Sequence, residues 1–146
     1  MTDKNLVYKF YDQVLPSYYI QKQTGISCAD FIAGLPFNLA CVAKYVWRHE
    51  NKDKRKDLEK AIQYILMEIK DREDQKYRPV YDIDSSFYFK LIESISNYEP
   101  KKYKCDIYRL LIVYLICLKK NCMENLFQIL EILKEQIGEE YPSATE

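Results

Sequence analysis

The chain has 146 residues, with 22 basic and 22 acidic side chains, one His, 14 Tyr, 3 Gly and 5 Pro. This length suits one domain whose core needs no disulfide or metal, and so little Gly and Pro excludes collagen-like and low-complexity sequence and argues against a turn-rich β-sandwich. A formal net charge of zero argues against a general polyanion binder, because such domains are strongly basic.

The sequence favours a cytoplasmic protein with no membrane contact. Residues 1–13 lack the basic and then apolar segments of a secretory signal. The longest apolar run, 110–118, is far shorter than the roughly 18 residues that span a bilayer. The cysteines are odd in number, and their spacing with His49 supports no zinc site. We therefore expect reduced thiols, no metal and no cofactor; the cysteines are Cys28, Cys41, Cys105, Cys117 and Cys122.

The first half of the chain predicts helices. Residues 1–15 are rich in Tyr and Phe and could form a short helix. Ser27 and Asp30 have the spacing of a capping box and predict a brief helix after Ser27. Two longer helices are expected over 37–49 and about 54–72. The second of them carries an apolar stripe at helical spacing, which consists of Leu58, Ala61, Ile62, Ile65 and Ile69.

The second half predicts three further helices. Asp84 is a plausible N-cap for a helix over 85–97. The next helix is expected from about Tyr103, and because it is apolar on nearly every face we expect it to be central. The last helix should begin near Met123 and end at Gly138, followed by a loose acidic tail.

These elements predict an all-α fold in a single domain spanning 1–146. The architecture should be a compact bundle of about five or six helices with a central helical hairpin over about 37–72. The remaining helices should lie within 84–138, ahead of the acidic C-terminal tail.

Charge is unevenly distributed along the chain. The segment 44–60 carries seven basic and four acidic side chains, whereas the segment from Asn121 to the end carries one basic and six acidic ones. These runs are either solvated helix faces or, in the basic segment, a surface that binds an anion.

Helical spacing identifies which residues of the basic segment share a face. Cys41, Lys44 and Arg48 lie at i, i+3 and i+7, and Asp57 and Lys60 begin the same pattern on the next helix, which Tyr64 completes. Two helices joined by a short loop pack antiparallel, so these faces could meet.

The meeting faces have two interpretations. Lys44, Arg48, Lys52 and Lys60 could bind phosphate, with Asp57 orienting Arg48 or holding a metal. Alternatively, Arg48 and Asp57 form a structural ion pair that fixes the hairpin.

The stretch 16–69 resembles the SaV-like family of small bacteriophage proteins. The resemblance rests on Pro16-Ser17-Tyr18-Tyr19, Gly25-Ile26, Phe37-Asn38-Leu39-Ala40-Cys41-Val42-Ala43-Lys44-Tyr45-Val46-Trp47-Arg48 and Asp57-Leu58-Glu59-Lys60-Ala61-Ile62-Gln63-Tyr64-Ile65. It implies a phage origin, a helical module over about 16–72 and a connection to nucleotides, because one characterised relative is a nucleoside-monophosphate kinase without a P-loop.

By that resemblance, Lys44, Arg48, Asp57 and Lys60 are candidate phosphate or nucleotide contacts, and Tyr45 and Tyr64 either pack between the helices or stack on a base. The sequence departs from the family pattern at three positions. Tyr18 stands where the family has His, Ala40 where it has Gly, and Cys41 where it has Asn. These changes remove an imidazole and an amide, which weakens the case for catalysis. The one imidazole, His49, is expected to be solvated or to support other residues.

Outside the resemblance, the second half of the chain is rich in Tyr. Basic and aromatic residues alternate in two segments, an arrangement that suits single-stranded nucleic acid or an acidic partner surface; filling of the core is the alternative. The candidate stacking or interface residues are Tyr18, Tyr45, Tyr64, Tyr77, Arg78, Tyr81, Lys101, Lys102 and Tyr103.

Two functions follow as hypotheses. The first is a non-enzymatic phage protein that binds or inhibits a host protein or nucleoprotein, for example an anti-CRISPR type of anti-defence factor. The second is a P-loop-independent nucleoside-monophosphate kinase or a nucleotide-binding protein. The altered polar positions favour the first, and the retained cations favour the second.

Overall fold

The computed structural model describes residues 21, 24–74, 83–98, 101–117 and 123–142. These residues contain six α-helices, one 3-10 helix and no strand, so the predicted all-α fold is confirmed. The elements are α2 (Cys28–Ile32), α3 (Phe37–Arg48), η2 (His49–Asn51), α4 (Arg55–Glu73), α5 (Ser85–Tyr98), α6 (Lys102–Ile116) and α7 (Met123–Glu140). The helix expected within residues 1–15 lies outside the described residues.

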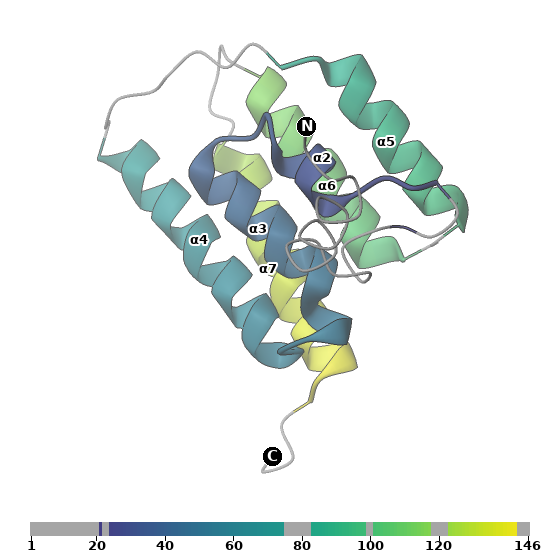
Figure 1. Cartoon of the computed structure of the whole chain (residues 1–146). Coiled ribbons are helices and arrows are strands. Elements are labelled where there is room, and N and C mark those ends of the chain that lie inside the picture. Colours follow the sequence, from purple (N-terminus) through teal and green to yellow (C-terminus); the bar gives the residue numbers. More distant parts are fainter. Residues whose placement is uncertain (1–20, 22–23, 75–82, 99–100, 118–122, 143–146) are drawn as a thin grey trace, which may run out of the picture.

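The helices form a bundle in which α7 links two pairs. α3 and α4 form an antiparallel hairpin joined by η2, and α5 packs on α6 (Figure 1). α7 contacts both α4 and α6, and it lies behind α3 in the view of Figure 1. The C-terminal helix therefore holds the hairpin and the α5–α6 pair together.

One continuous apolar core contains side chains from all six α-helices. The predicted stripe of α4 faces this core, since Leu58, Ala61 and Ile65 are fully buried. On the facing helix α3, Leu39 and Val42 are fully buried as well. Burial of these faces supplies the main driving force for packing.

Local signals in the sequence set two helix starts. The Ser27 side chain accepts a hydrogen bond from the Asp30 backbone N–H, and the Asp30 carboxylate accepts one from the Ser27 N–H, so the capping box is present. Asp84 accepts a hydrogen bond from the Phe87 N–H and caps α5 as predicted.

Two predictions about the C-terminal helices are wrong. The expectation that α6 is surrounded by other helices fails because Val113 and Ile116 remain 39% and 44% exposed. The expected end at Gly138 fails as well, because α7 continues to Glu140 and the Tyr141 N–H still donates to the Ile137 carbonyl. Gly138 needs no left-handed conformation there and stays helical.

None of the helices in the described ranges is both long and apolar enough to cross a membrane. The four cysteines within those ranges are free thiols: Cys28 and Cys105 are buried, Cys41 is half-buried and Cys117 is exposed. Burial raises the pKa of the Cys28 thiol to about 12, despite the opposing charges of Lys104, Lys44 and Arg48. Cys28 is therefore an unreactive core thiol.

Tyr108 joins α6 to two other helices. Its ring stacks on Phe31 of α2 with centroids 4.5 Å apart, and its hydroxyl donates to the Ala43 carbonyl of α3 at 2.9 Å. Both atoms of this hydrogen bond are buried.

We expect Tyr108→Phe to lower the free energy of unfolding by about 1 kcal/mol, because it removes a buried hydrogen bond between α6 and α3. Chemical denaturation followed by circular dichroism measures the change. The matched control is Tyr98→Phe, since Tyr98 is 57% exposed. Equal stability of the two variants would contradict a structural role for this hydrogen bond.

Candidate functional site

The α3–α4 hairpin brings together the residues that helical spacing placed on facing sides. Arg48 contacts Asp57, the Cys41 thiol hydrogen-bonds with Tyr64, and Lys44 and Lys60 both approach Tyr45. We call the outer surface of this hairpin, formed by Phe37, Cys41, Lys44, Tyr45, Lys60 and Tyr64, the hairpin face.

Arg48 and Asp57 form a buried ion pair at the closed end of the hairpin. Arg48 Nη2 lies 3.0 Å from Asp57 Oδ1, and the side chains are only 8% and 0% exposed. The other carboxylate oxygen, Oδ2, accepts a hydrogen bond from the Asp53 N–H at 3.1 Å. Asp57 also lies in the first turn of α4, where the helix dipole stabilises negative charge. This geometry matches the interpretation of the pair as a structural clamp.

Tyr45 is the centre of the hairpin face. Its ring centroid lies 4.7 Å from Arg48 Cζ, 5.8 Å from Lys44 Nζ and 5.5 Å from Lys60 Nζ, all within cation–π range. Tyr64 stacks on the same ring at 5.9 Å with an interplanar angle of 18°. The Lys60 Nζ lies 4.0 Å from Asp53 Oδ2, and both side chains are 43% exposed, so this cation is loosely paired and still reaches water beside the aromatic pair.

Cys41 points across the hairpin at Tyr64. The proximity and hydrogen bond of this thiol, together with partial desolvation, raise the pKa of the Tyr64 phenol above its usual 10.0. Phe37 packs edge-on against Tyr64 at 5.9 Å and is itself 70% exposed. The hairpin face is thus an aromatic surface with two flanking lysines.

A second polar cluster, which the sequence did not predict, surrounds His49. The expectation that His49 is solvated is wrong, since it is 3% exposed. Its Nδ1 lies 2.8 Å from the Tyr141 hydroxyl and its Nε2 lies 3.3 Å from Gln136 Nε2. Tyr141 and Gln136 follow His49 by more than 85 residues in the sequence, so no local spacing could have indicated these contacts.

The hydrogen bonds of His49 indicate which ring nitrogen carries the proton. The Gln136 amide nitrogen carries two N–H groups. One donates to the Glu140 carboxylate at 3.1 Å and the other faces His49 Nε2, which therefore accepts. Nδ1 then carries the proton and donates to Tyr141. Burial lowers the pKa of His49 below its usual 6.5 and outweighs the opposing effects of Glu140 and Glu50.

Two predicted interface residues of the second half pair within the protein. Lys101 Nζ lies 2.7 Å from Glu50 Oε2, and the Tyr103 hydroxyl donates to Glu139. Burial opposes the ionisation of Glu50, but the hydrogen bond and charge of Lys101 outweigh it and hold the pKa below its usual 4.5. The Glu139 hydrogen bond raises the pKa of Tyr103 to about 12. Lys102 remains exposed.

These contacts correct the expectation of a loose tail that starts after Gly138. Glu139 and Glu140 belong to α7, and Tyr141 is held by His49 and by Arg55, whose Nη1 donates to the Tyr141 carbonyl at 3.3 Å. Residues 143–146 lie outside the described part of the chain.

The remaining predicted site residues are not brought to the hairpin face. Lys52 lines an open groove with Lys54, Arg55, Lys56 and the segment 140–142. Tyr18, Tyr77, Arg78 and Tyr81 lie outside the described residues. Within the described ranges, no three His, Cys, Asp or Glu side chains come together as a metal site would require.

Comparison with known proteins does not extend this description. No family model, curated protein or solved structure matched the chain. The SaV-like resemblance therefore stays a prediction, and the geometry of the chain itself carries the functional argument.

We expect Asp57→Asn to lower the free energy of unfolding by about 3 kcal/mol, because it leaves the buried Arg48 charge with only the half-exposed Asp53 carboxylate, 3.8 Å away. Urea denaturation measures the loss. The control Glu59→Gln removes an exposed i, i+4 pair with Arg55 and should change stability by less than about 1 kcal/mol. A small effect of Asp57→Asn would contradict the clamp.

Stability should also depend on pH through His49. Since burial keeps His49 neutral in the native state, the unfolded chain binds more protons as the pH falls below about 6.5. The free energy of unfolding should therefore decrease between pH 7 and pH 5, with a slope of at most about 1.4 kcal/mol per pH unit for this single group.

The variant His49→Gln should flatten that slope, since Gln stays neutral and His49 is the one His of the chain. Urea denaturation at several pH values measures it in both proteins. Equal slopes in the two proteins would show that other groups cause the dependence.

Proposed function

We propose that this chain is a non-enzymatic binding protein whose hairpin face contacts a phosphate-bearing partner, of the kind that a nucleoprotein presents. In the phage setting that the resemblance implies, the partner is a host nucleoprotein, and inhibition of a host defence nuclease is one form of this function. The observation that carries the proposal is the division of roles among the cations of the hairpin.

Arg48 is buried against Asp57, so it is used in folding. The ammonium groups of Lys44 and Lys60 lie 5.8 and 5.5 Å from the centroid of the Tyr45 ring, which stacks on Tyr64. Stacked aromatic rings bordered by cations suit bases and backbone phosphates of single-stranded nucleic acid. The arrangement supports contact with a polyanion more than phosphoryl transfer, because transfer requires electrostatic groups that converge on the reacting phosphate.

We expect Lys44→Ala/Lys60→Ala to weaken binding of a labelled single-stranded oligonucleotide about tenfold, and to reduce the slope of log K against log[salt] by about 1.4, because two phosphate contacts are lost. Fluorescence anisotropy measures both quantities. The control Lys70→Ala/Lys90→Ala removes the same charge from exposed positions on α4 and α5 and should leave the affinity within about twofold.

Two outcomes would contradict the proposal. Equal weakening in both double variants would mean that the hairpin face has no special role. Transfer of phosphate from ATP to a nucleoside monophosphate, lost in Lys44→Ala, would favour the nucleotide-kinase hypothesis instead.

A further inference from the structure

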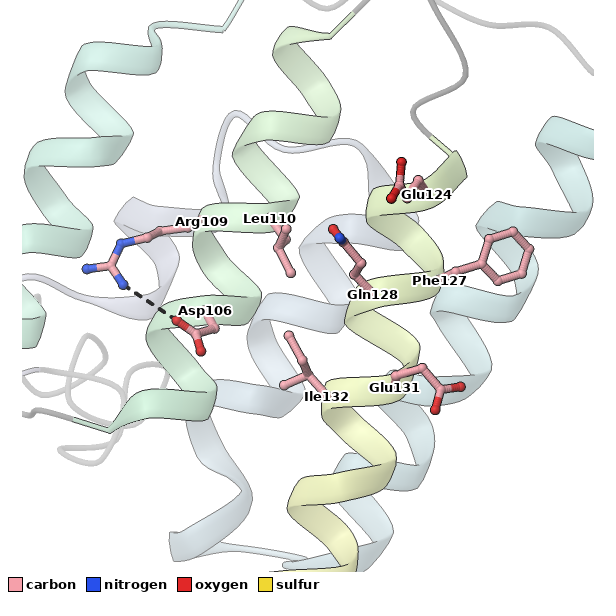
Figure 2. Close-up of a pocket in the computed structure, with 8 residues that line it drawn as sticks. All are labelled: Asp106, Arg109, Leu110, Glu124, Phe127, Gln128, Glu131 and Ile132. Atoms are coloured by element: carbon pink, nitrogen blue, oxygen red, sulfur yellow. Dashed lines mark ion pairs between the residues drawn. The ribbon is translucent and has the colours of Figure 1, made fainter.

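A groove with an apolar centre and an acidic rim lies between α6 and α7. It encloses about 620 Å³ and is lined by Asp106, Arg109, Leu110, Glu124, Phe127, Gln128, Glu131 and Ile132. Figure 2 shows Leu110 of α6 and Ile132 of α7 pointing into the space between the helices, while Phe127 projects from the other flank of α7. We call this surface the α6/α7 groove.

The apolar surface at the groove is accessible. Phe127 is 46% exposed, and Val113, one helical turn beyond Leu110 on α6, is 39% exposed. Ile116, at the C-terminal end of α6, is 44% exposed as well. Neighbouring exposed apolar side chains rimmed by polar residues are typical of protein-interaction sites.

The rim of the groove is weakly acidic. Three carboxylates line the groove, those of Asp106, Glu124 and Glu131, against one guanidinium. That guanidinium, of Arg109, lies 3.7 Å from Asp106 on its own helix, so the two charges offset each other. Lys134 likewise approaches Glu131 at 3.4 Å, so three carboxylates face two cations and the rim keeps a net charge of −1. A basic partner complements this rim.

The dimensions of the groove suit a helix. Glu124 to Ile132 span about 12 Å along α7. Apolar residues at i, i+3, i+4 and i+7 of a partner helix cover about 10 Å along its axis and lie on one face. Such a helix can place its apolar residues over Leu110 and Ile132, with Phe127 on the far flank of α7 and its own flanking side chains at the acidic rim.

We propose that the α6/α7 groove binds a basic amphipathic helix of a partner protein. The surface is separate from the hairpin face: α3 lies in front of α7 in Figure 1 and behind α6 and α7 in Figure 2. The proposal is independent of nucleic-acid binding by the hairpin face, and either surface can fail its test without the other.

The test uses two synthetic helical peptides with identical Leu spacing, one with Lys and one with Glu on its flanks, added to the full chain. Fluorescence anisotropy measures affinity, and amide chemical shifts locate the binding site. We expect the Lys peptide to bind and to shift the amides of α6 and α7, with an affinity that falls as salt is added, and the Glu peptide to bind at least about tenfold more weakly.

Matched variants distinguish peptide binding at the α6/α7 groove from nonspecific electrostatic binding elsewhere on the protein. Glu124→Lys/Glu131→Lys should weaken the Lys peptide about tenfold and favour the Glu peptide, whereas the control Glu73→Lys/Glu93→Lys should leave both affinities within about twofold. Phe127→Ala should weaken binding, whereas Phe37→Ala on the hairpin face should not. Circular dichroism confirms that each variant is folded.

Three results would overturn the proposal. They are equal affinity for the two peptides, chemical shift changes that map outside α6 and α7, and no binding at millimolar peptide. Sedimentation velocity adds a fourth, since a dimer of the chain that is lost in Phe127→Ala would assign the groove to a second copy.

Discussion

The buried ion pair between Arg48 and Asp57 is the constraint on which the rest of the hairpin depends. A charge removed from water is tolerated only when a partner compensates it, so these two side chains fix the separation of α3 and α4 at the point where they are joined. Asp57 also accepts the Asp53 N–H and so holds the connecting turn. With this end fixed, the stack of Tyr45 on Tyr64 and the approach of the lysines follow from helix geometry.

A second polar cluster ties the C-terminal helix to the same end of the hairpin. His49 contacts Gln136 and Tyr141 of the last helical segment, and Arg55 holds the Tyr141 carbonyl. On the neighbouring helix, Lys104 is buried with its ammonium 4.3 Å from the Trp47 ring centroid. The closed end of the hairpin is therefore where α3, α4, α6 and α7 meet through polar contacts, whereas apolar packing and the buried Tyr108–Ala43 hydrogen bond hold the rest of the bundle.

Basic and acidic side chains therefore lie on different surfaces of the bundle. The net charge of zero is the sum of these unlike surfaces. The hairpin face presents Lys44 and Lys60 beside aromatic rings, and the α6/α7 groove presents Glu124 and Glu131 beside apolar side chains. Because Arg48 is buried, the formal charge of the segment 44–60 overstates the charge that a ligand meets. A protein with two unlike surfaces is suited to selective contacts with macromolecules rather than to coating a polyanion.

Capping residues and helical periodicity in the sequence predicted the helices, the hairpin and the shared face of Arg48, Asp57 and Lys60, because both signals act over a few neighbouring positions. The sequence did not determine the burial of His49 or the end of α7, since both depend on contacts between residues far apart in the chain. Nor could it decide whether Arg48 binds a ligand or closes the hairpin, because spacing gives a shared face but not its exposure to water. Only the tertiary structure decided that, by burying Asp57 completely and leaving Lys60 at the surface.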